Sequence, residues 1–267
     1  MTTLTVVILT HNEAHRLHRC LNAIPSRYPI VVIDCGSTDT TIAIATERGC
    51  QVYYNTWSGF AEQRNFALER CHIATPWVLF IDADEIYPLR FYDWFEREIA
   101  FNDIIAAVMV PSLLFFRNHC LKHAPGYPIY HPRLVRTHQV RFMTNHTGHG
   151  ESIPITVPTH YATIPYDHYF YDGHLSQWMT KHISHACQEV KRQATPGALL
   201  TKRGRIMMWL SKVPILRIPG RFFYHYCFCL GFLDGRAGLE YSLMYTWYEA
   251  TKSVLEYTFR KHHHETL

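Results

Sequence analysis

The sequence predicts an α/β fold built on a mostly parallel β-sheet. In residues 1–85, short and almost wholly apolar runs alternate with segments of helical periodicity. Apolar runs of this kind are typical of strands buried on both faces, and their regular alternation with helices implies right-handed crossovers between parallel strands. Polar residues directly follow several of the runs. Because ligands of parallel sheets bind beyond the carboxyl ends of the strands, the fold class also predicts where a site lies.

Four strands and three helices are expected in this first part of the chain. The first helix takes Asn12 as its N-cap and ends at Pro25. The second follows a turn in which Ser37 is available as a cap, and it is stopped by Gly49. The third helix covers residues 58–71. The expected strands are 4–9, 30–33, 51–54 and 77–81.

The rest of the chain is predicted to add further strands and then a helical extension. Apolar residues recur at helical spacing from Leu175 to Val190. Residues 203–260 are rich in aromatic residues and arginine, and we expect helices there that are interrupted at Pro214, Pro219 and Gly220. The other expected elements are a helix at 88–100, a strand at 104–111 that 112–116 extends, a polar loop at 117–130 and a strand at 133–136. We therefore divide the chain into an α/β domain, residues 1–172, and a helical extension, residues 173–267.

Composition restricts the classes of function. The net charge of +4 suits anionic small substrates or a membrane surface, but it is too small and too scattered to indicate nucleic acid. The sequence contains neither a GxGxxG motif nor a Walker A motif, so dinucleotide and P-loop sites have no residues to form them. Eight cysteines without a CxxC pair, and an N-terminus that enters a strand directly, favour reduced thiols and a cytoplasmic location. No apolar run reaches the roughly 20 residues that span a bilayer.

The segment WVLFIDADE, residues 77–85, is the strongest chemical signal. Three carboxylates, Asp82, Asp84 and Glu85, follow a buried strand, where they are costly without a cation among them. Two acidic residues separated by one position can share a Mg²⁺ or Mn²⁺ ion and leave room for phosphate oxygens. The alternative is a solvated acidic turn after a core strand. The polar residues at the ends of the neighbouring strands favour the metal.

Several motifs together resemble those of family 2 glycosyltransferases with the GT-A fold, and most closely the branch of lipopolysaccharide-core glucosyltransferases. They are VVILTHNEAHRLHRCL, VVIDCGSTDTT, the run from Trp57 to Asn65, FIDADE, RLVR at Arg133, the HGE at His149, Lys181-His182 with Gln188-Glu189, and GFLDGRAGL at Gly231 to Leu239. These motifs are distributed over most of the chain. Gly150 departs from the pattern, because the branch usually has the histidine and the glutamate adjacent.

The resemblance implies transfer of a sugar from a nucleotide diphosphate to an acceptor hydroxyl, with a divalent Mn or Mg ion. It implies that Asp84 binds the metal and that Glu151 is the general base, so that direct attack inverts the anomeric centre. His168 completes the metal site or, alternatively, is a structural histidine packed among aromatic residues. The residues implied for nucleotide-sugar binding are Thr10, Asn12, Glu13, Asp34, Arg64, Asp82 and Arg133.

Some of these residues have simpler alternatives. Asp34 suits an Asx-turn that starts the next helix. Arg64 on a helix and Arg133 on a strand are equally compatible with solvated charges. Glu151 is otherwise a turn residue between two strands.

Three functions remain open. The first is a transferase of cell-surface glycan assembly that acts on a glycan or glycolipid such as lipopolysaccharide core. The second is a polyprenyl-phosphate glycosyltransferase, and the third is a non-catalytic nucleotide-sugar-binding scaffold. Basic residues interleaved with aromatic ones in residues 203–260 predict a peripheral contact with the cytoplasmic face of the inner membrane, unless the aromatics pack on the α/β domain. The cations concerned are Arg203, Arg205, Lys212, Arg217 and Arg221.

Overall fold

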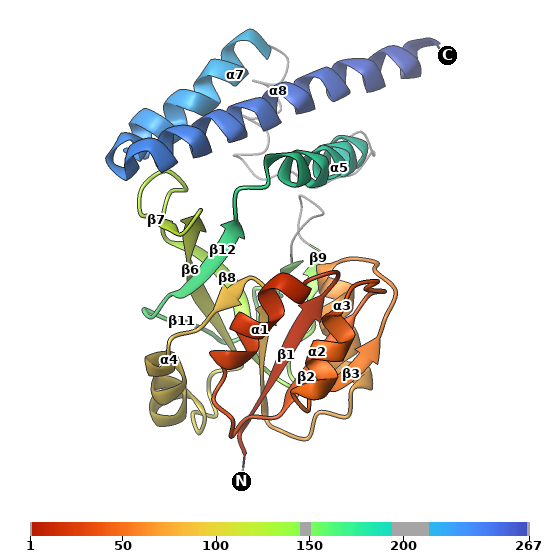
Figure 1. Cartoon of the computed structure of the whole chain (residues 1–267), viewed down its shortest axis with the longest axis vertical. Helices are drawn as coiled ribbons and strands as arrows, with labels where there is room; N and C mark the ends of the chain where they lie inside the picture. Colours follow the sequence, from red (N-terminus) through yellow and green to blue (C-terminus); the bar gives the residue numbers. More distant parts are fainter. Residues whose placement is uncertain (1, 145–150, 194–213, 266–267) are drawn as a thin grey trace. The chain divides into compact units, whose positions relative to one another are not determined.

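The computed structural model describes residues 2–144, 151–193 and 214–265, and it divides into two compact units. Unit 1 comprises the described parts of residues 1–113, 128–145 and 150–168. Unit 2 comprises the described parts of residues 114–127 and 169–267. Figure 1 shows the helices and strands of each unit along the chain.

Unit 1 is built on four parallel strands, as the sequence predicts. They are β1 (Leu4–Thr10), β2 (Ile30–Asp34), β3 (Gln51–Tyr54) and β4 (Trp77–Asp82). β1 lies between β2 and β4, with Val6 paired to Ile30 on one side and to Leu79 on the other. The parallel register brings the carboxyl ends of β1, β2 and β4 to the same edge of the sheet.

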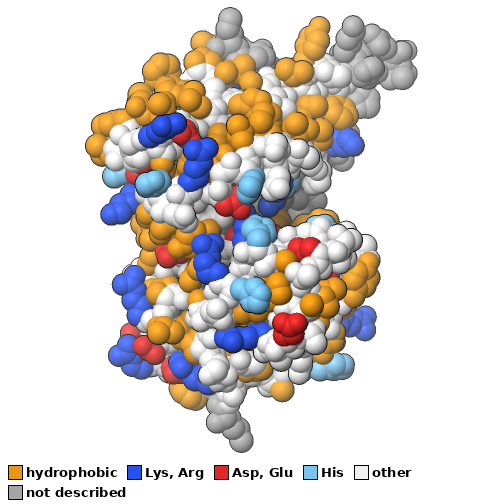
Figure 2. All heavy atoms as spheres, viewed as in Figure 1, with side chains coloured by type: hydrophobic (Ala, Val, Ile, Leu, Met, Phe, Trp, Pro, Cys, Tyr) orange, Lys and Arg blue, Asp and Glu red, His pale blue; other side chains and the backbone are white. Residues whose placement is uncertain are grey.

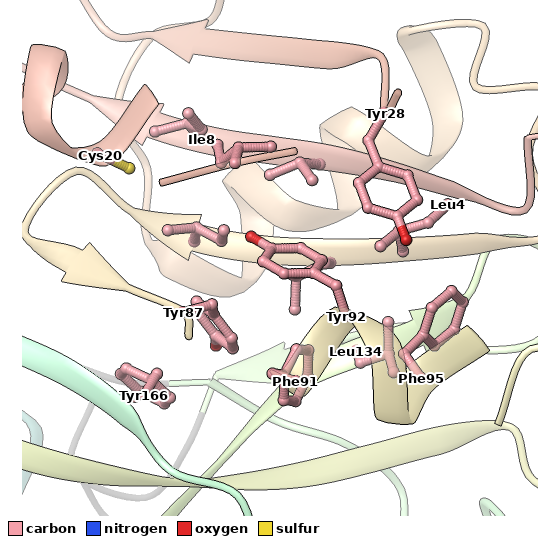
Figure 3. Close-up of a cluster of buried hydrophobic side chains, with 14 of the residues drawn as sticks. Leu4, Ile8, Cys20, Tyr28, Tyr87, Phe91, Tyr92, Phe95, Leu134 and Tyr166 are labelled. Atoms are coloured by element: carbon pink, nitrogen blue, oxygen red, sulfur yellow. The ribbon is translucent and has the colours of Figure 1, made fainter. Parts of the chain in front are cut away.

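Helices cover both faces of these strands, which explains why β1 is buried throughout. Val6 and Ile8 of β1 pack with residues of α1 (Ala14–Asn22), α2 (Thr41–Glu47) and α4 (Leu89–Trp94). Val7 and Leu9 point to the opposite face and pack with residues of α3 (Phe60–Arg70). Figure 3 shows part of the first face, where aromatic rings of Tyr87, Phe91, Tyr92 and Tyr166 fill the space beside the sheet.

The sheet continues beyond β4 with antiparallel strands. Its strand order is β3-β2-β1-β4-β8-β6-β12-β5, and β7 and β11 pair with β6. α4 continues directly into a π-helical turn, η1 (Phe95–Ile99), so that one helical segment occupies most of the predicted range. The bounds of these strands are β5 (Glu85–Ile86), β6 (Ala107–Phe116), β7 (His119–Leu121), β8 (Ile129–Arg136), β11 (Thr159–Tyr161) and β12 (Tyr166–Tyr171). A separate two-stranded sheet is formed by β9 (Met143–Thr144) and β10 (Glu151–Ser152).

Unit 2 is mainly helical. Its elements include α5 (Leu175–Gln193), α7 (Pro214–Phe223), the π-helical turn η2 (Tyr224–Phe228), the 3₁₀ turn η3 (Gly231–Asp234) and α8 (Gly235–Glu265). A buried ion-pair network joins α7 to α8, because Arg217 Nε lies 2.6 Å from Glu249 and its Nη1 lies 2.9 Å from Glu256. Lys252 of α8 likewise pairs with Glu189 of α5 at 2.6 Å. Among the described residues, no helix has the length and apolar character needed to cross a bilayer.

Several local predictions are wrong. Asn12 does not cap α1, because the N-cap position belongs to Glu13 and Asn12 has a left-handed φ of 56°. Ser37 does not cap α2, which starts at Thr41. Pro219 and Gly220 lie inside α7 without interrupting it. The predicted loop at 117–130 contains strand β7.

One other local prediction is confirmed, because Gly49 ends α2 with a left-handed φ of 77°. The eight cysteines are free in the structure.

Candidate active site

Asp34 and Thr10 meet at the carboxyl ends of β2 and β1. Thr10 Oγ1 donates to Asp34 Oδ2 at 2.9 Å, and both residues are buried. Asp34 Oδ1 also accepts the backbone N–H groups of Gly36 at 2.9 Å and Ser37 at 2.7 Å, which is an Asx-turn. Burial works against the charged carboxylate, but the hydrogen bonds from Ser37, Gly36 and Thr10 lower the pKa of Asp34 overall. The turn suggested as the alternative role of Asp34 is therefore present.

Asn12 and Glu13 hold the loop after β1 against the loop after β2. Asn12 Oδ1 accepts the N–H of Thr38 at 2.8 Å, and the Asn12 N–H donates to Ser37 Oγ at 2.8 Å. The Glu13 N–H donates to Thr41 Oγ1 at 2.9 Å. These two loops form one connected polar surface next to Asp34.

Asp82, at the end of β4, lies between two arginines. Arg64 of α3 approaches Oδ1 at 3.4 Å, and Arg133 of β8 donates to Oδ2 at 2.9 Å. Strand β8 runs antiparallel to β4 and pairs Leu134 with Leu79, which places Arg133 toward the carboxyl end of β4. Both arginines are buried, so they are not solvated charges. Burial raises the pKa of Asp82, but Arg133 and Arg64 more than offset it and leave the pKa lowered.

Glu151 and Glu85 complete this buried cluster. Glu151 Oε1 lies 3.1 Å from Arg133 Nη1, and its Oε2 lies 3.2 Å from Arg64 Nη1. Glu85 is fully buried, contacts Arg133 Nη2 and accepts the N–H of Asp82 at 3.1 Å. Burial raises the pKa of Glu85 to about 7, although Arg133 acts in the opposite direction. The Nε atoms of both arginines have no hydrogen-bond partner among the described residues.

Asp84 lies close to His168 and to Arg16. The distance from Asp84 Oδ2 to His168 Nε2 is 3.5 Å, and Arg16 Nη1 of α1 lies 3.6 Å from the same oxygen. Strand β12 pairs His168 with Glu85, which brings the imidazole to the acidic turn. Burial alone would lower the pKa of His168, but the Asp84 carboxylate reverses this and raises it.

Asp84 Oδ2 and His168 Nε2 lie 3.5 Å apart, which is close enough for one ion to contact both atoms. No group of three or more His, Cys, Asp or Glu residues in the described part of the chain could hold a metal ion by itself. A two-residue site nevertheless fits a divalent cation whose remaining ligands are substrate phosphates and water, which is common for Mg²⁺. The residues present therefore fit such an ion.

The structure brings together most of the residues predicted for the site. It also adds Arg16 and Glu85, which the sequence reasoning did not include in the site. Glu85 was visible as the third carboxylate of the acidic motif, but nothing in the sequence indicated its contact with Arg133. Residues 145–150, including His149 of the HGE motif, lie outside the described residues.

Residues 5–110 match the profile of the family described as glycosyl transferase family 2. An uncharacterized glycosyltransferase of Rickettsia felis is 34% identical over 121 residues, which cover 44% of this chain and 42% of the relative. The lipopolysaccharide core biosynthesis glycosyltransferase LpsC of Rhizobium meliloti is 38% identical over 87 residues, which cover 31% of this chain and 32% of LpsC. The matched segment thus spans about two fifths of the length of the first of these relatives and about a third of the second.

Among solved structures, the chain is similar to glucosyl-3-phosphoglycerate synthase from Mycobacterium tuberculosis in complex with Mn²⁺, uridine diphosphate and glucosyl-3-phosphoglycerate. The identity is 16%, the TM-score is 0.48, and the match covers 73% of this chain and 81% of the synthase. The predicted GT-A type of α/β fold agrees with the family match and with the parallel strands and covering helices of unit 1. Residues 5–110 of this chain are thus similar to the glycosyl transferases of family 2.

Proposed function

We propose that this chain is a glycosyltransferase that moves a sugar from a nucleotide-diphosphate donor to a hydroxyl of a cell-surface glycan or glycolipid, such as lipopolysaccharide core. The observation that carries the proposal is the family 2 match over 5–110, which contains Thr10, Asp34, Asp82 and Asp84 at one edge of the sheet. The similarity to LpsC supports a lipopolysaccharide-type acceptor.

The donor binds at the edge formed by the loops after β1, β2 and β4. Asn12, Glu13 and Asp34 face the nucleoside. Their hydrogen bonds with Thr38, Thr41 and Ser37, respectively, hold the two loops in a fixed shape before the donor arrives. Arg64 and Arg133 lie beside the diphosphate and hold Asp82 in place between them.

Asp84 and His168 would hold a divalent cation, Mn²⁺ or Mg²⁺, beside the donor phosphates. Such a cation would supply positive charge against the negative charge that develops on the leaving nucleotide diphosphate. A metal would bind only a deprotonated ring nitrogen of His168, and the Asp84 carboxylate works against this form because it raises the pKa of the imidazole. Arg16 Nη1 lies 3.6 Å from the same Asp84 oxygen and orients the carboxylate.

Glu151 acts as the general base toward the acceptor hydroxyl, and a single direct displacement inverts the anomeric configuration. Each of its oxygens approaches one arginine, at 3.1 Å and 3.2 Å. A carboxylate oxygen has two lone pairs, so each oxygen keeps one direction in which it can accept a hydroxyl. The two arginines fix the orientation of Glu151 and so define the side from which the acceptor approaches.

Release of nucleotide diphosphate from a panel of nucleotide sugars, with and without Mn²⁺ or Mg²⁺, tests the function. We expect one donor to be turned over in a cation-dependent manner. Asp84→Asn should abolish this turnover, whereas Asp103→Asn should not, since the Asp103 side chain is 96% exposed and pairs with Arg136 at 3.2 Å. Donor binding without turnover on any acceptor would favour a nucleotide-sugar-binding scaffold instead. Full activity in excess chelator would overturn the role of Asp84.

A further inference from the structure

Unit 2 exposes a compact group of large apolar side chains where η2 meets η3. The exposed fractions are 80% for Phe228, 45% for Leu230, 48% for Phe232 and 58% for Leu233. Scattered exposed apolar residues are normal, but four within six consecutive positions form a patch of the kind that marks an interaction site. We call these four residues the η3 tip.

The η3 tip has a defined conformation. Asp234, at the end of η3, accepts three consecutive backbone N–H groups, those of Lys122 at 3.0 Å, His123 at 2.9 Å and Ala124 at 2.7 Å. The buried His225 ring bonds the carbonyl of Ala124 at 2.7 Å, which ties η2 to the same loop. Leu230 itself has a left-handed φ of 60°, a costly conformation for leucine that persists because these contacts hold it.

Close packing restrains the tip further. A Cβ atom at Gly231 would lie 2.5 Å from the backbone oxygen of His225, and one at Gly238 would lie 2.0 Å from the oxygen of Gly231. Both positions therefore require glycine. The GFLDGRAGL motif thus forms a rigid turn. The side chains of Phe232 and Leu233 within it are exposed to solvent.

Cationic side chains accompany the tip. Lys122 is exposed, and its backbone is bonded to Asp234. Arg236, two residues after Asp234, has a side chain that is 88% exposed and pairs with Glu240 at 2.9 Å. Figure 2 shows hydrophobic side chains gathered over unit 2 with Lys and Arg side chains among them. The combination is an apolar centre with two exposed cations beside it, of which Arg236 is partly compensated by Glu240.

We propose that the η3 tip, flanked by Lys122 and Arg236, is a docking surface for an anionic lipid bilayer. The tip is an anchored turn of flexible and aromatic apolar side chains, and a bilayer can accept such side chains without a matching pocket. Lipid phosphates meet the flanking cations, each of which favours binding to an anionic surface by about fivefold. Of the five cations expected from the sequence to contact a membrane, Arg217 is buried in ion pairs and Arg221 lies 5.8 Å from the centre of the Tyr245 ring. The other three, Arg203, Arg205 and Lys212, lie outside the described residues.

Only the biological role of the lipid contact, which is to bring the enzyme to a glycolipid acceptor, rests on the proposed function. The contact itself requires neither donor nor turnover. A failure of the docking surface is therefore distinguishable from a failure of the proposed transfer reaction.

Flotation of the full chain with two kinds of vesicle tests the proposal. One is phosphatidylcholine alone, and the other contains added phosphatidylglycerol. We expect binding to the anionic vesicles that weakens as salt is raised. The variant Phe228→Ser/Phe232→Ser/Leu233→Ser should bind about 100-fold more weakly, since each inserted apolar side chain contributes up to about tenfold. Lys122→Gln/Arg236→Gln should weaken binding to the vesicles that contain phosphatidylglycerol and leave binding to the phosphatidylcholine vesicles unchanged.

Phe101→Ser/Ile104→Ser is the matched control, because these side chains of unit 1 are 80% and 81% exposed. It should bind as the unmodified chain does. Thermal unfolding of every variant checks that the fold is retained. Three results would overturn the proposal: no flotation of the unmodified chain, undiminished flotation of the triple variant, or a dimer that the triple variant converts to monomer. The last would assign the tip to contact between copies of this chain.

Discussion

Replacing Arg133 by methionine tests how the buried cluster stabilises unit 1. The guanidinium is almost fully buried and contacts three carboxylates, those of Asp82 at 2.9 Å, Glu151 at 3.1 Å and Glu85. Methionine keeps much of the apolar stem but leaves Arg64 as the remaining arginine of the cluster. We expect Arg133→Met to be strongly destabilising at neutral pH.

The magnitude follows from what is left behind. Removing one partner of a buried ion pair costs about 3–5 kcal/mol, because the other charge stays buried without compensation. Three carboxylates lose the same cation here, so we expect the upper half of this range, about 4 kcal/mol. For a unit of this size that corresponds to a decrease in Tm of about 10 °C. The loss should shrink as the pH falls, because protonation removes the uncompensated negative charges.

Urea unfolding of the full chain at pH 8 and pH 5 measures both effects. Arg141→Met is the control, since its side chain is 73% exposed and its pair with Glu69 is a surface pair worth about 0–1 kcal/mol. The double variant Arg133→Met/Glu85→Gln removes a cation and a carboxylate together. We expect it to be less destabilised than the sum of the two single variants. A sum that is simply additive, or a loss below about 1 kcal/mol for Arg133→Met, would refute the reasoning.

Three further predictions concern single residues. Glu151→Gln should keep donor affinity while turnover falls about 10²–10⁴-fold, because a base acts on the acceptor; a lost donor affinity with intact turnover at saturation would make Glu151 a binding residue. Asp234→Asn should destabilise unit 2 by about 2 kcal/mol in urea unfolding, because an amide cannot accept all three N–H groups that the carboxylate accepts; an unchanged midpoint would contradict this. Burial lowers the pKa of His225 to about 4 in the folded chain, so as the pH falls the histidine of the unfolded chain is protonated at a higher pH than that of the folded chain. The free energy of unfolding should therefore fall by at most about 3 kcal/mol as the pH drops from about 6.5 to 4. His225→Asn keeps a donor toward Ala124 and should lose this part of the pH dependence; an unaltered pH profile would assign it to other groups.

The parallel core could be predicted from the sequence because strands that are buried on both faces appear as uninterrupted apolar runs. Residues 4–9 and 77–81 are almost wholly apolar, and the structure extends each strand by only one residue, to Thr10 and Asp82. Gly49 was recognisable as the end of a helix because few other residues adopt its left-handed conformation. Such signals are local, so no tertiary information is needed to interpret them.

The wrong predictions arise where tertiary contacts decide. Asn12 resembles an N-cap, but its side-chain oxygen Oδ1 accepts a hydrogen bond from the N–H of Thr38, 26 residues away in the sequence. Arg217 resembles a surface cation, but Glu249 and Glu256 of α8 make its burial tolerable. Pro219 stays within α7 although proline usually interrupts a helix. For Asn12 and Arg217 the partner lies far along the chain, where periodicity and composition give no indication of it. The described part of the structure offers no comparable contact that explains Pro219.

The charge balance of the cluster bears on how a diphosphate could be neutralised at this edge of the sheet. Arg64 and Arg133 are matched by Asp82 and Glu151, so the cluster is close to neutral while Glu85 holds its proton. Glu85 loses that proton near pH 7, and the cluster then carries an excess negative charge. The two arginines therefore cannot by themselves compensate a bound diphosphate. The missing positive charge has to come from beyond the cluster. Arg16 is itself matched by Glu13 and Asp84, so a cation at Asp84 and His168 would have to supply it. This is why the proposed transfer should depend on a divalent ion even though two buried arginines lie beside its donor.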